Sequence, residues 1–261
     1  MGILHSEEEI VYHFFTETEF FMGSEAVITG PDVNHIKNVL RMKPGERILL
    51  SDGKGTNCLG ELEEIGSDRI TVKLLPEEVE DTELPVEVTL YQGLPKGDKM
   101  EFIIQKCVEL GVSRIVPVEM SRCVVKLEPK KEEAKRKRWY GISESAAKQS
   151  KRMIVPEIAP VMKYKDAVQE AEKTDLFLLP YEDSESLEGA GGMELTRELI
   201  RRLEPGQKCA VLIGPEGGFS DAEVEIAKAH AAKTITLGKR ILRTETAGLF
   251  VMSAIGLLLE K

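Results

Sequence analysis

From residue 86 onward, short apolar runs alternate with longer amphipathic ones, and this alternation limits the possible folds more than any other feature. The apolar runs are VEVTLYQG (86–93), RIVPVEM (114–120), DLFLLP (175–180), KCAVLIG (208–214) and TITLG (234–238). Helical patterns between and after them include Lys99–Leu110, Glu128–Gln149, Asp221–His230 and Glu245–Glu260. Continuously apolar strands separated by helices indicate an α/β fold whose parallel sheet is covered on both faces.

The first 80 residues follow a different pattern, with short, partly alternating runs between Gly, Asp and Ser turns. These runs lie at 11–15, 25–30, 47–53, 57–65 and 69–75. One short helix is expected among them, with Asp32 as its N-cap and with Val33, Ile36, Val39 and Leu40 on one face. The pattern predicts a small β-barrel over residues 1–80. The acidic stretch 76–85 then acts as a linker to a second domain over residues 86–261.

Composition excludes several classes of protein. No stretch approaches the roughly 18 uncharged apolar residues of a membrane helix, and LFVMSAIGLLL (249–259) predicts a buried helix or an oligomer contact. The N-terminus lacks the pattern of an export signal. The four cysteines are scattered without CxxC and the four histidines lack metal-ligand spacing. We therefore expect a cytoplasmic protein without a metal site.

Charge is unevenly distributed along the chain. The net charge of −10 alone argues against binding to nucleic acid, but residues 122–152 hold eleven basic and four acidic side chains. A local basic patch on an acidic protein is suited to an anionic polymer. A solvated helix face with Glu–Lys pairs explains the same residues equally well. Charge alone leaves both interpretations open.

Two loops near the C-terminal end carry more polar and glycine residues than a simple connection needs. In IGPEGGFS (213–220), Gly217 and Gly218 permit positive φ and close backbone approach, and Ser220 with Glu223 forms a capping box for the next helix. The preceding Pro215-Glu216 presents a carboxylate on a rigid turn, which favours a polar ligand. Ligands of parallel sheets bind beyond the carboxyl ends of the strands, where this loop lies.

The second loop, LGKRILRTETAGL (237–249), is strongly basic. Lys239, Arg240 and Arg243 precede a helix that we expect to begin at Glu245, with Thr244 or Thr246 as its cap. Arg243 offers a planar fork of donors to an anion or a carbonyl. The chain lacks GxGxxG after a strand, GxxxxGK[ST] and GxSxG. The residues thus predict an α/β enzyme that holds a polar ligand between two loops.

Five ordered blocks resemble the bacterial 16S ribosomal RNA uridine-N3 methyltransferase family of the SPOUT superfamily. They are HIKNVLR (35–41), GLPKGDKMEFIIQKCVELG (93–111), a middle block of RCVVK (122–126), Arg138-Trp139 and SESAAKQSKR (143–152), and the two loops. One departure is His13, which stands where the family usually has an arginine before the aromatic pair. A histidine there is still able to contact a phosphate.

The resemblance implies S-adenosylmethionine as the methyl donor. It also implies a homodimer whose sites use both subunits, an N-terminal PUA-like barrel that holds RNA, and a trefoil knot in the C-terminal domain. The cofactor would lie against residues of the two loops. These are Ile213, Gly214, Pro215, Glu216, Gly217, Leu237, Gly238, Ile241, Leu242, Arg243 and Thr244.

The resemblance also suggests roles for individual residues. Arg243 would stabilise the charge of the uridine anion, and Glu216 or Glu245 would accept the N3 proton. The partner would be 16S ribosomal RNA or the 30S subunit. The expected RNA contacts are His13, Arg41, Lys96, Lys99, Arg122, Lys126, Arg138 and Arg152.

Three other functions compete with this one. The nearest is a SPOUT methyltransferase that acts on another RNA or another atom. A non-catalytic RNA-binding ribosome-assembly factor is the second. The third, a Rossmann-type oxidoreductase, is disfavoured by the missing dinucleotide fingerprint.

Overall fold

The computed structural model describes residues 11–181 and 192–260. The chain divides into two compact units, one of residues 1–82 with 151–154, and one of residues 83–150 with 155–261. The short return of 151–154 to the first unit is not anticipated by a boundary near residue 80. There, Ile154 bridges Gly53 and Lys54, and the Thr82 hydroxyl donates to the Lys151 carbonyl.

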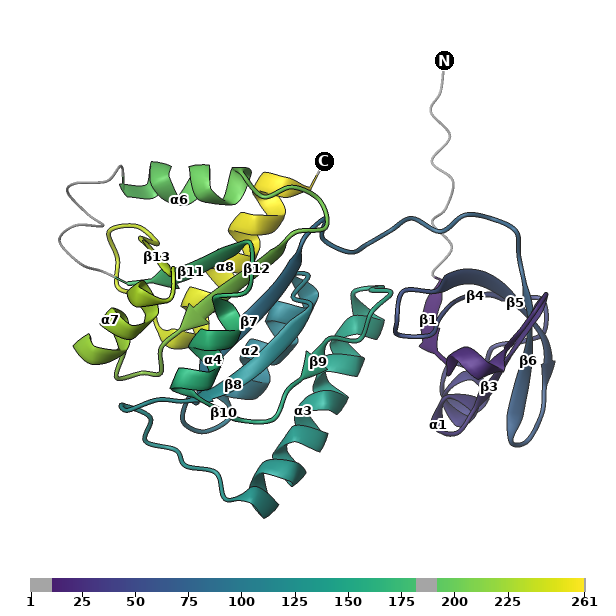
Figure 1. Cartoon of the computed structure of the whole chain (residues 1–261). Coiled ribbons are helices and arrows are strands. Elements are labelled where there is room, and N and C mark those ends of the chain that lie inside the picture. Colours follow the sequence, from purple (N-terminus) through teal and green to yellow (C-terminus); the bar gives the residue numbers. More distant parts are fainter. Residues whose placement is uncertain (1–10, 182–191, 261) are drawn as a thin grey trace. The chain divides into compact units, whose positions relative to one another are not determined.

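The first unit is a curled six-stranded sheet (Figure 1). Its strands are β1 (Tyr12–Phe15), β2 (Phe21–Met22), β3 (Glu25–Thr29), β4 (Arg47–Ser51), β5 (Asn57–Ile65) and β6 (Arg69–Leu74), in the order β1-β4-β5-β6-β3-β2. β1 and β4 run parallel and the other neighbours antiparallel. Alternate strand residues such as Ala26, Ile28, Ile70 and Val72 fill the core. The predicted β-rich N-terminal fold is confirmed.

The helical segment of this unit differs from the expectation. It comprises a 3-10 turn η1 (Thr18–Phe20), a helix α1 (Pro31–Asn34) and a π-helical stretch η2 (His35–Leu40). α1 begins at Pro31, with Gly30 as its N-cap, because proline suits the first helical position; Asp32 is therefore not the cap. The wider π turn breaks the 3.6-residue period, and Val39 is 64% exposed instead of buried.

The second unit is a parallel α/β sheet, as predicted. Its strands are β7 (Glu87–Gly93), β8 (Arg114–Glu119), β9 (Glu157–Ile158), β10 (Met162–Lys163), β11 (Leu176–Pro180), β12 (Lys208–Ile213) and β13 (Lys233–Ile235). They follow the order β10-β8-β7-β12-β11-β13, with β9 also paired to β8, and every pairing is parallel. The carboxyl ends of these strands therefore share one edge of the sheet.

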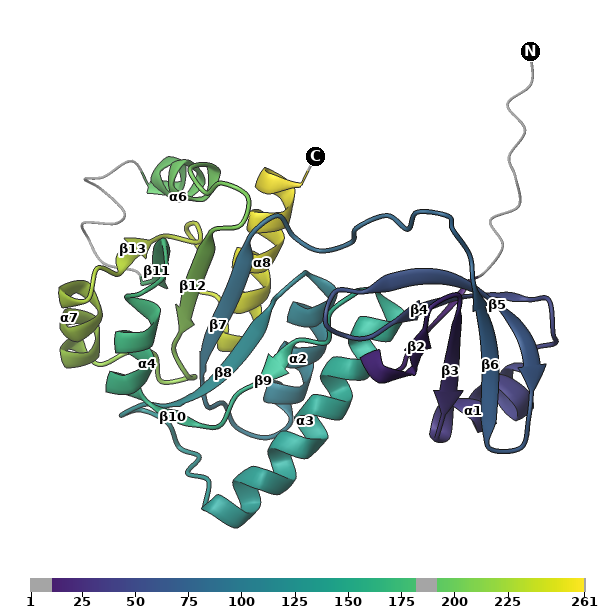
Figure 2. The same cartoon turned by 45° about the vertical axis from the view of Figure 1, so that its right-hand side comes forward.

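Helices cover both faces of this sheet (Figures 1 and 2). They are α2 (Lys99–Glu109), α3 (Pro129–Gln149), α4 (Tyr164–Ala171), α6 (Gly192–Arg201), α7 (Asp221–Ala229) and α8 (Thr244–Leu259). α2, α3, α6 and α8 pack against one another on one side, whereas α4 and α7 pack together on the other. The trefoil knot concerns how the chain threads between these layers, and it stays a prediction.

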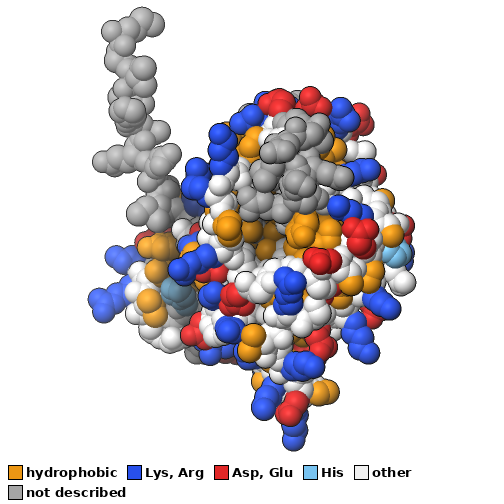
Figure 3. Space-filling model, turned by 90° about the vertical axis from the view of Figure 1, so that its left-hand side faces the viewer, with side chains coloured by type: hydrophobic (Ala, Val, Ile, Leu, Met, Phe, Trp, Pro, Cys, Tyr) orange, Lys and Arg blue, Asp and Glu red, His pale blue; other side chains and the backbone are white. Residues whose placement is uncertain are grey.

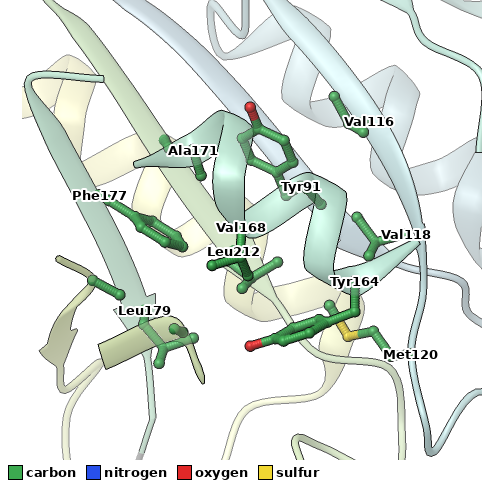
Figure 4. Packing of buried hydrophobic residues seen from close by; sticks show 14 of the residues in the cluster. Tyr91, Val116, Val118, Met120, Tyr164, Val168, Ala171, Phe177, Leu179 and Leu212 are labelled. Atoms are coloured by element: carbon green, nitrogen blue, oxygen red, sulfur yellow. The ribbon is translucent and has the colours of Figure 1, made fainter. Parts of the chain in front are cut away.

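The core under α4 and α7 reaches the functional edge of the sheet. Tyr91, Val118, Leu179 and Leu212 come from four strands, and Tyr164 packs against them from α4 (Figure 4). The Tyr164 hydroxyl donates to the backbone carbonyl of Glu223 in α7. Burial of this apolar surface holds the strand ends in place for the loops that follow. No helix in the described part of the chain has the length and hydropathy of a membrane span.

Candidate active site

A cavity of about 640 Å³ lies beyond the carboxyl ends of β11, β12 and β13. Both decorated loops line it, together with the residues that follow β11. Ten of the eleven residues predicted to hold the cofactor line this cavity, all except Gly217. On the side of the second unit that carries α7 and β13, hydrophobic side chains gather between lysine and arginine side chains (Figure 3).

The loop after β12 is held in a tight turn. The Gly218 N–H donates to the Pro215 carbonyl, and Gly218 takes a φ of 66°. Gly217 instead supplies space, because a Cβ there would lie 3.0 Å from the Cβ of Arg122. The Arg122 guanidinium donates to the Gly217 carbonyl. The loop is thus packed against the turn that follows β8, which the sequence pattern did not indicate.

The predicted capping box closes this loop and starts α7. The Ser220 hydroxyl accepts from the Glu223 N–H, and the Glu223 carboxylate accepts from the Ser220 N–H. The same carboxylate accepts from the backbone N–H and the hydroxyl of Ser121. Burial raises the pKa of Glu223, but these hydrogen bonds outweigh it and leave the pKa lowered. Glu223 therefore joins the turn after β8 to the loop after β12.

A buried hydrogen-bond chain joins the second loop to the first. The Thr244 hydroxyl donates to the Gly214 carbonyl at 2.6 Å and accepts from the Gln92 side-chain amide at 2.9 Å. Thr244 is therefore not the expected helix cap: α8 begins at this residue, and its N-cap Arg243 makes no side-chain capping bond. The chain links the end of β7, the end of β12 and the start of α8. Gln92 is a polar residue in a buried strand, a sequence signal that we did not use.

Arg243 lies at the mouth of the cavity. Its side chain is exposed to solvent and lines the cavity, directly before α8. Within residues 11–181 and 192–260, no carboxylate forms an ion pair with its guanidinium. A cation that has no ion pair in the described part of the chain, next to a helix N-terminus, gives this wall a positive potential. The site therefore has a donor group available for an anionic or partly anionic ligand.

The two candidate carboxylates share one lysine. Lys99 Nζ lies 3.0 Å from Glu216 Oε1 and 3.4 Å from Glu245 Oε2. Glu216 also accepts from the Lys96 N–H at 3.0 Å. Burial raises the pKa of Glu216, but the bonds from Lys96 and Lys99 outweigh it and leave the pKa lowered. Glu216 is among the residues that line the cavity, and Glu245 is not.

An aromatic pair forms part of the wall, and the sequence analysis missed it. Tyr181 and Phe219 both line the cavity, with ring centroids 6.4 Å apart in an edge-to-face arrangement. Tyr181 follows β11 directly, and its N–H donates to the Ile235 carbonyl. A residue directly after a buried parallel strand is a position that the strand-end rule would have found. The pair adds apolar surface to the cavity wall.

Seven of the eight residues predicted to contact RNA fall into two groups, and the eighth is Lys99, which pairs with Glu216 and Glu245. Lys96, Arg122, Lys126 and Arg138 are exposed in the second unit, and Arg41 is exposed in the first. His13 and Arg152 are buried in the first unit, with exposed fractions of 7% and 2%. His13 Nε2 lies 2.7 Å from the Ser51 hydroxyl, so the imidazole ring forms a buried hydrogen bond within the first unit. The two buried side chains do not present themselves to an RNA surface.

The basic helix α3 carries features of both earlier interpretations. Lys131 pairs with Glu128, Lys148 with Glu144, and Arg138 with Glu101. These pairs suit a solvated face. Most of the other basic side chains of the stretch are exposed. In the described ranges, no group of three His, Cys, Asp or Glu side chains has the arrangement of a metal site.

Known proteins share both units. The model of the RNA methyltransferase domain matches residues 82–256, and that of the RNA methyltransferase PUA domain matches residues 28–75. The ribosomal RNA small subunit methyltransferase E of Bacillus subtilis is 39% identical over 228 residues, which cover 87% of this chain and 88% of that protein. The protein of the same name from Synechocystis is 30% identical over 251 residues, covering 96% and 79%.

A solved structure is similar over nearly the whole length of this chain. It is the crystal structure of a ribosomal RNA small subunit methyltransferase E from Neisseria gonorrhoeae bound to S-adenosyl methionine. Its sequence is 33% identical, its TM-score is 0.78, and the match covers 95% of this chain and 98% of that one.

A parallel sheet with a cavity at its carboxyl edge and an N-terminal PUA domain define the class as RNA methyltransferases. Within that class, the chain belongs to the ribosomal RNA small subunit methyltransferase E family. The family, the fold class and the enzyme class predicted from the five sequence blocks are confirmed.

Proposed function

We propose that this chain transfers the methyl group of S-adenosylmethionine to N3 of a uridine in 16S ribosomal RNA, on the assembled small subunit in the cytoplasm. The carrying observation is one cavity lined by both loops, with Arg243, which forms no ion pair among the described residues, at its mouth. The relatives named as small-subunit methyltransferases, one of them solved with the methyl donor, support the substrate and the cofactor.

The residues of the cavity fit this cofactor. A volume of about 640 Å³ falls within the range of roughly 300–1,000 Å³ for small-molecule sites. Tyr181 and Phe219 offer apolar contact for a nucleoside base, and backbone groups of the two loops offer hydrogen bonds. When bound, S-adenosylmethionine supplies an electrophilic methyl group on a sulfonium centre.

The chemistry at uridine requires loss of the N3 proton, because the neutral imide nitrogen is a poor nucleophile. The resulting anion spreads its charge onto O2 and O4. We assign Arg243 to those oxygens, because a preorganised donor placed where charge develops lowers the barrier. The target base must leave its stack, or already be single-stranded, to reach the cavity.

The proton acceptor is one of two carboxylates. Glu216 lines the cavity, but its lowered pKa makes it a weak base that stays ionised. Glu245 is not among the lining residues, and its Oε2 is enclosed without a hydrogen-bond partner in the described residues. The variants Glu216→Gln and Glu245→Gln, compared at saturating cofactor, separate the two. The larger fall in kcat marks the acceptor.

Labelled cofactor with 30S subunits and with naked 16S ribosomal RNA tests the reaction. We expect label in the 30S sample, and mass spectrometry of the digested RNA should place the methyl group on uridine N3. A ribose 2′-O-methyl product, or a product in another RNA, would favour a different SPOUT activity. Failure to bind the cofactor in equilibrium dialysis would favour a ribosome-assembly factor.

The variant Arg243→Ala tests the role of the guanidinium. We expect kcat to fall about 10²- to 10³-fold, the usual loss for one such donor, with cofactor affinity changed less than threefold. Arg197→Ala is the matched control, because Arg197 pairs with Glu194 in α6 and does not line the cavity. Methylation by Arg243→Ala at the wild-type rate would remove Arg243 from the mechanism.

The basic stretch 122–152 is proposed to contact RNA phosphates. Each phosphate contact releases bound counterions, so affinity for RNA should fall steeply as salt is added. Lys126→Gln should lower the slope of log affinity against log salt by about one half to one. A flat salt dependence would assign α3 to the solvated-face interpretation.

We further propose a homodimer whose sites use both subunits. α8 and α2 pack against each other, and each exposes a large apolar residue, Leu257 at 85% and Phe102 at 46%. Apolar residues exposed on adjoining helices are typical of a subunit contact. Sedimentation should show a dimer of about twice 29 kDa, and Leu257→Glu should shift it toward the monomer.

A further inference from the structure

Lys99 occupies a helix position that disfavours a cation. It is the first residue of α2, where the helix dipole is positive and lysine is unfavourable. Its expected role was a contact to RNA phosphate, which needs an outward-pointing ammonium. In the structure the ammonium instead lies between Glu216 and Glu245, and the side chain lines the cavity. The two ion pairs therefore offset the unfavourable interaction of Lys99 with the helix dipole.

The two carboxylates come from different walls of the site. Glu216 belongs to the loop after β12, and Glu245 lies in the first turn of α8. Their side chains are 27% and 17% exposed, so water screens them only in part. Both pair with the same Nζ atom, so the two oxygens lie close to each other. Without the ammonium, like charges this close would favour protonation of one carboxyl group.

The enclosed oxygen of Glu245 depends on this cation most. Glu245 Oε2 is shielded from solvent and has no hydrogen-bond partner among the described residues, while Lys99 Nζ lies 3.4 Å away. A buried carboxylate oxygen without compensation is costly. Glu216 has a second anchor in the Lys96 N–H, which keeps it beside the start of α2. Of the two partners of Lys99, Glu216 is also held by the Lys96 backbone N–H, whereas Glu245 Oε2 is held by the charge of Lys99.

We propose that Lys99 is a positioning residue of the methylation site, whose ammonium pairs with both Glu216 and Glu245 and holds the two carboxylates in place between the two loops. This assignment rests on the proposed function and deepens it. It removes Lys99 from the set of phosphate contacts, and it makes the two carboxylates a coupled pair. Whichever of them accepts the uridine proton does so under the control of Lys99.

Three variants test the proposal. Lys99→Met removes the charge, and Lys99→Arg restores a cation. Lys106→Met is the matched control, because Lys106 is in the same helix, is similarly exposed, and pairs with Glu109 away from the cavity. The Lys99 side chain is one-third exposed, so Lys99→Met should fold, and its melting curve verifies this.

The first readout needs no activity. We expect ¹³C NMR titration of the Glu216 carboxyl group to show a higher pKa in Lys99→Met than in the wild type, because the hydrogen bond and the charge of Lys99 lower that pKa. The carboxyl pKa should return to the wild-type value in Lys99→Arg and stay at that value in Lys106→Met. Unchanged carboxyl titration in Lys99→Met would overturn the proposal. This readout stays decisive if the wild type fails to methylate 30S subunits, an outcome that counts against the proposed function alone.

The second readout is kinetic. With Lys99→Met, we expect the acidic limb of the pH–rate profile to move upward by about one unit, so that kcat measured on that limb falls about tenfold while kcat at the plateau changes little. KM for 30S subunits and its salt dependence should stay within twofold of the wild type. A raised KM with a reduced salt slope and unchanged kcat would show a phosphate contact, and would likewise overturn the proposal.

Discussion

The variant Thr244→Val tests whether the hydrogen-bond chain through Thr244 holds the two cofactor loops together. Valine has almost the shape of threonine but lacks the hydroxyl, so packing is preserved and only polar contacts are lost. Thr244 is 6% exposed, so water does not replace those contacts. The Gly214 carbonyl loses its donor, and the Gln92 amide loses one acceptor while keeping the Gly93 carbonyl at 3.0 Å.

The cost follows from these two losses. A buried carbonyl left without a donor costs about 1–3 kcal/mol, and the weaker loss at Gln92 adds about 0.5–1 kcal/mol. A total of about 3 kcal/mol lowers the melting temperature by roughly 6–12 °C for a chain of this size. Because these hydrogen bonds join the two loops that line the cavity, their loss should also weaken cofactor binding. We expect the cofactor Kd to rise about tenfold, which corresponds to about 1.4 kcal/mol.

The assays are differential scanning calorimetry and isothermal titration with S-adenosylmethionine, on wild type, Thr244→Val and Thr244→Ser. Serine keeps the hydroxyl, so Thr244→Ser should recover most of the stability and nearly all of the affinity. If Thr244→Val melted within 1 °C of the wild type and bound the cofactor equally well, the hydrogen-bond chain would not hold the loops.

Two further variants probe the same edge of the sheet. Gly93→Ala would place a Cβ 2.7 Å from the Pro215 backbone nitrogen, so we expect the free energy of unfolding to fall by about 1–3 kcal/mol and cofactor binding to weaken. Gly141→Ala in α3 is the control, because its Cβ would meet no atom within 4 Å. This variant should slightly raise the melting temperature. The lowered pKa of Glu223 gives stability that is present above about pH 4.5 and lost as pH falls through the folded-state pKa. The difference in melting temperature between wild type and Glu223→Gln should therefore shrink from pH 6 to pH 3.5, and a constant difference would contradict the assigned hydrogen bonds.

Local patterns in the sequence predicted the architecture well. The longer strands of both units and the helices α2, α3 and α7 follow from hydrophobic periodicity, which depends on neighbours only a few residues apart. The two-residue strands β2, β9 and β10 and the helix α4 were not predicted. The capping box of Ser220 and Glu223 is local in the same sense. The π-helical stretch after Asn34 is an unusual local structure, and there the same reasoning wrongly predicted that Val39 is buried.

Residue roles were harder to predict than elements, because they depend on distant partners. Lys99 was counted among the phosphate contacts on its charge, yet its carboxylate partners follow 117 and 146 positions later. Thr244 was expected to cap its helix, yet its hydroxyl reaches Gly214. His13 bonds Ser51 inside the barrel, and a basic or aromatic residue in a motif does not reveal which way it faces.

The sequence by itself determined the longer strands, the two-part organisation into a β-rich and a parallel α/β portion, and the two loops in which chemistry had to be sought. These properties are set by short-range periodicity, turn residues and short sequence motifs. Only the tertiary structure decided which charges meet. Parallel strands bring their carboxyl ends to one edge, so Lys99, Glu216 and Glu245 become neighbours and Arg243 is left without a carboxylate in the described residues. Electrostatic energy depends on distance in space, and that distance exists only after the chain has folded.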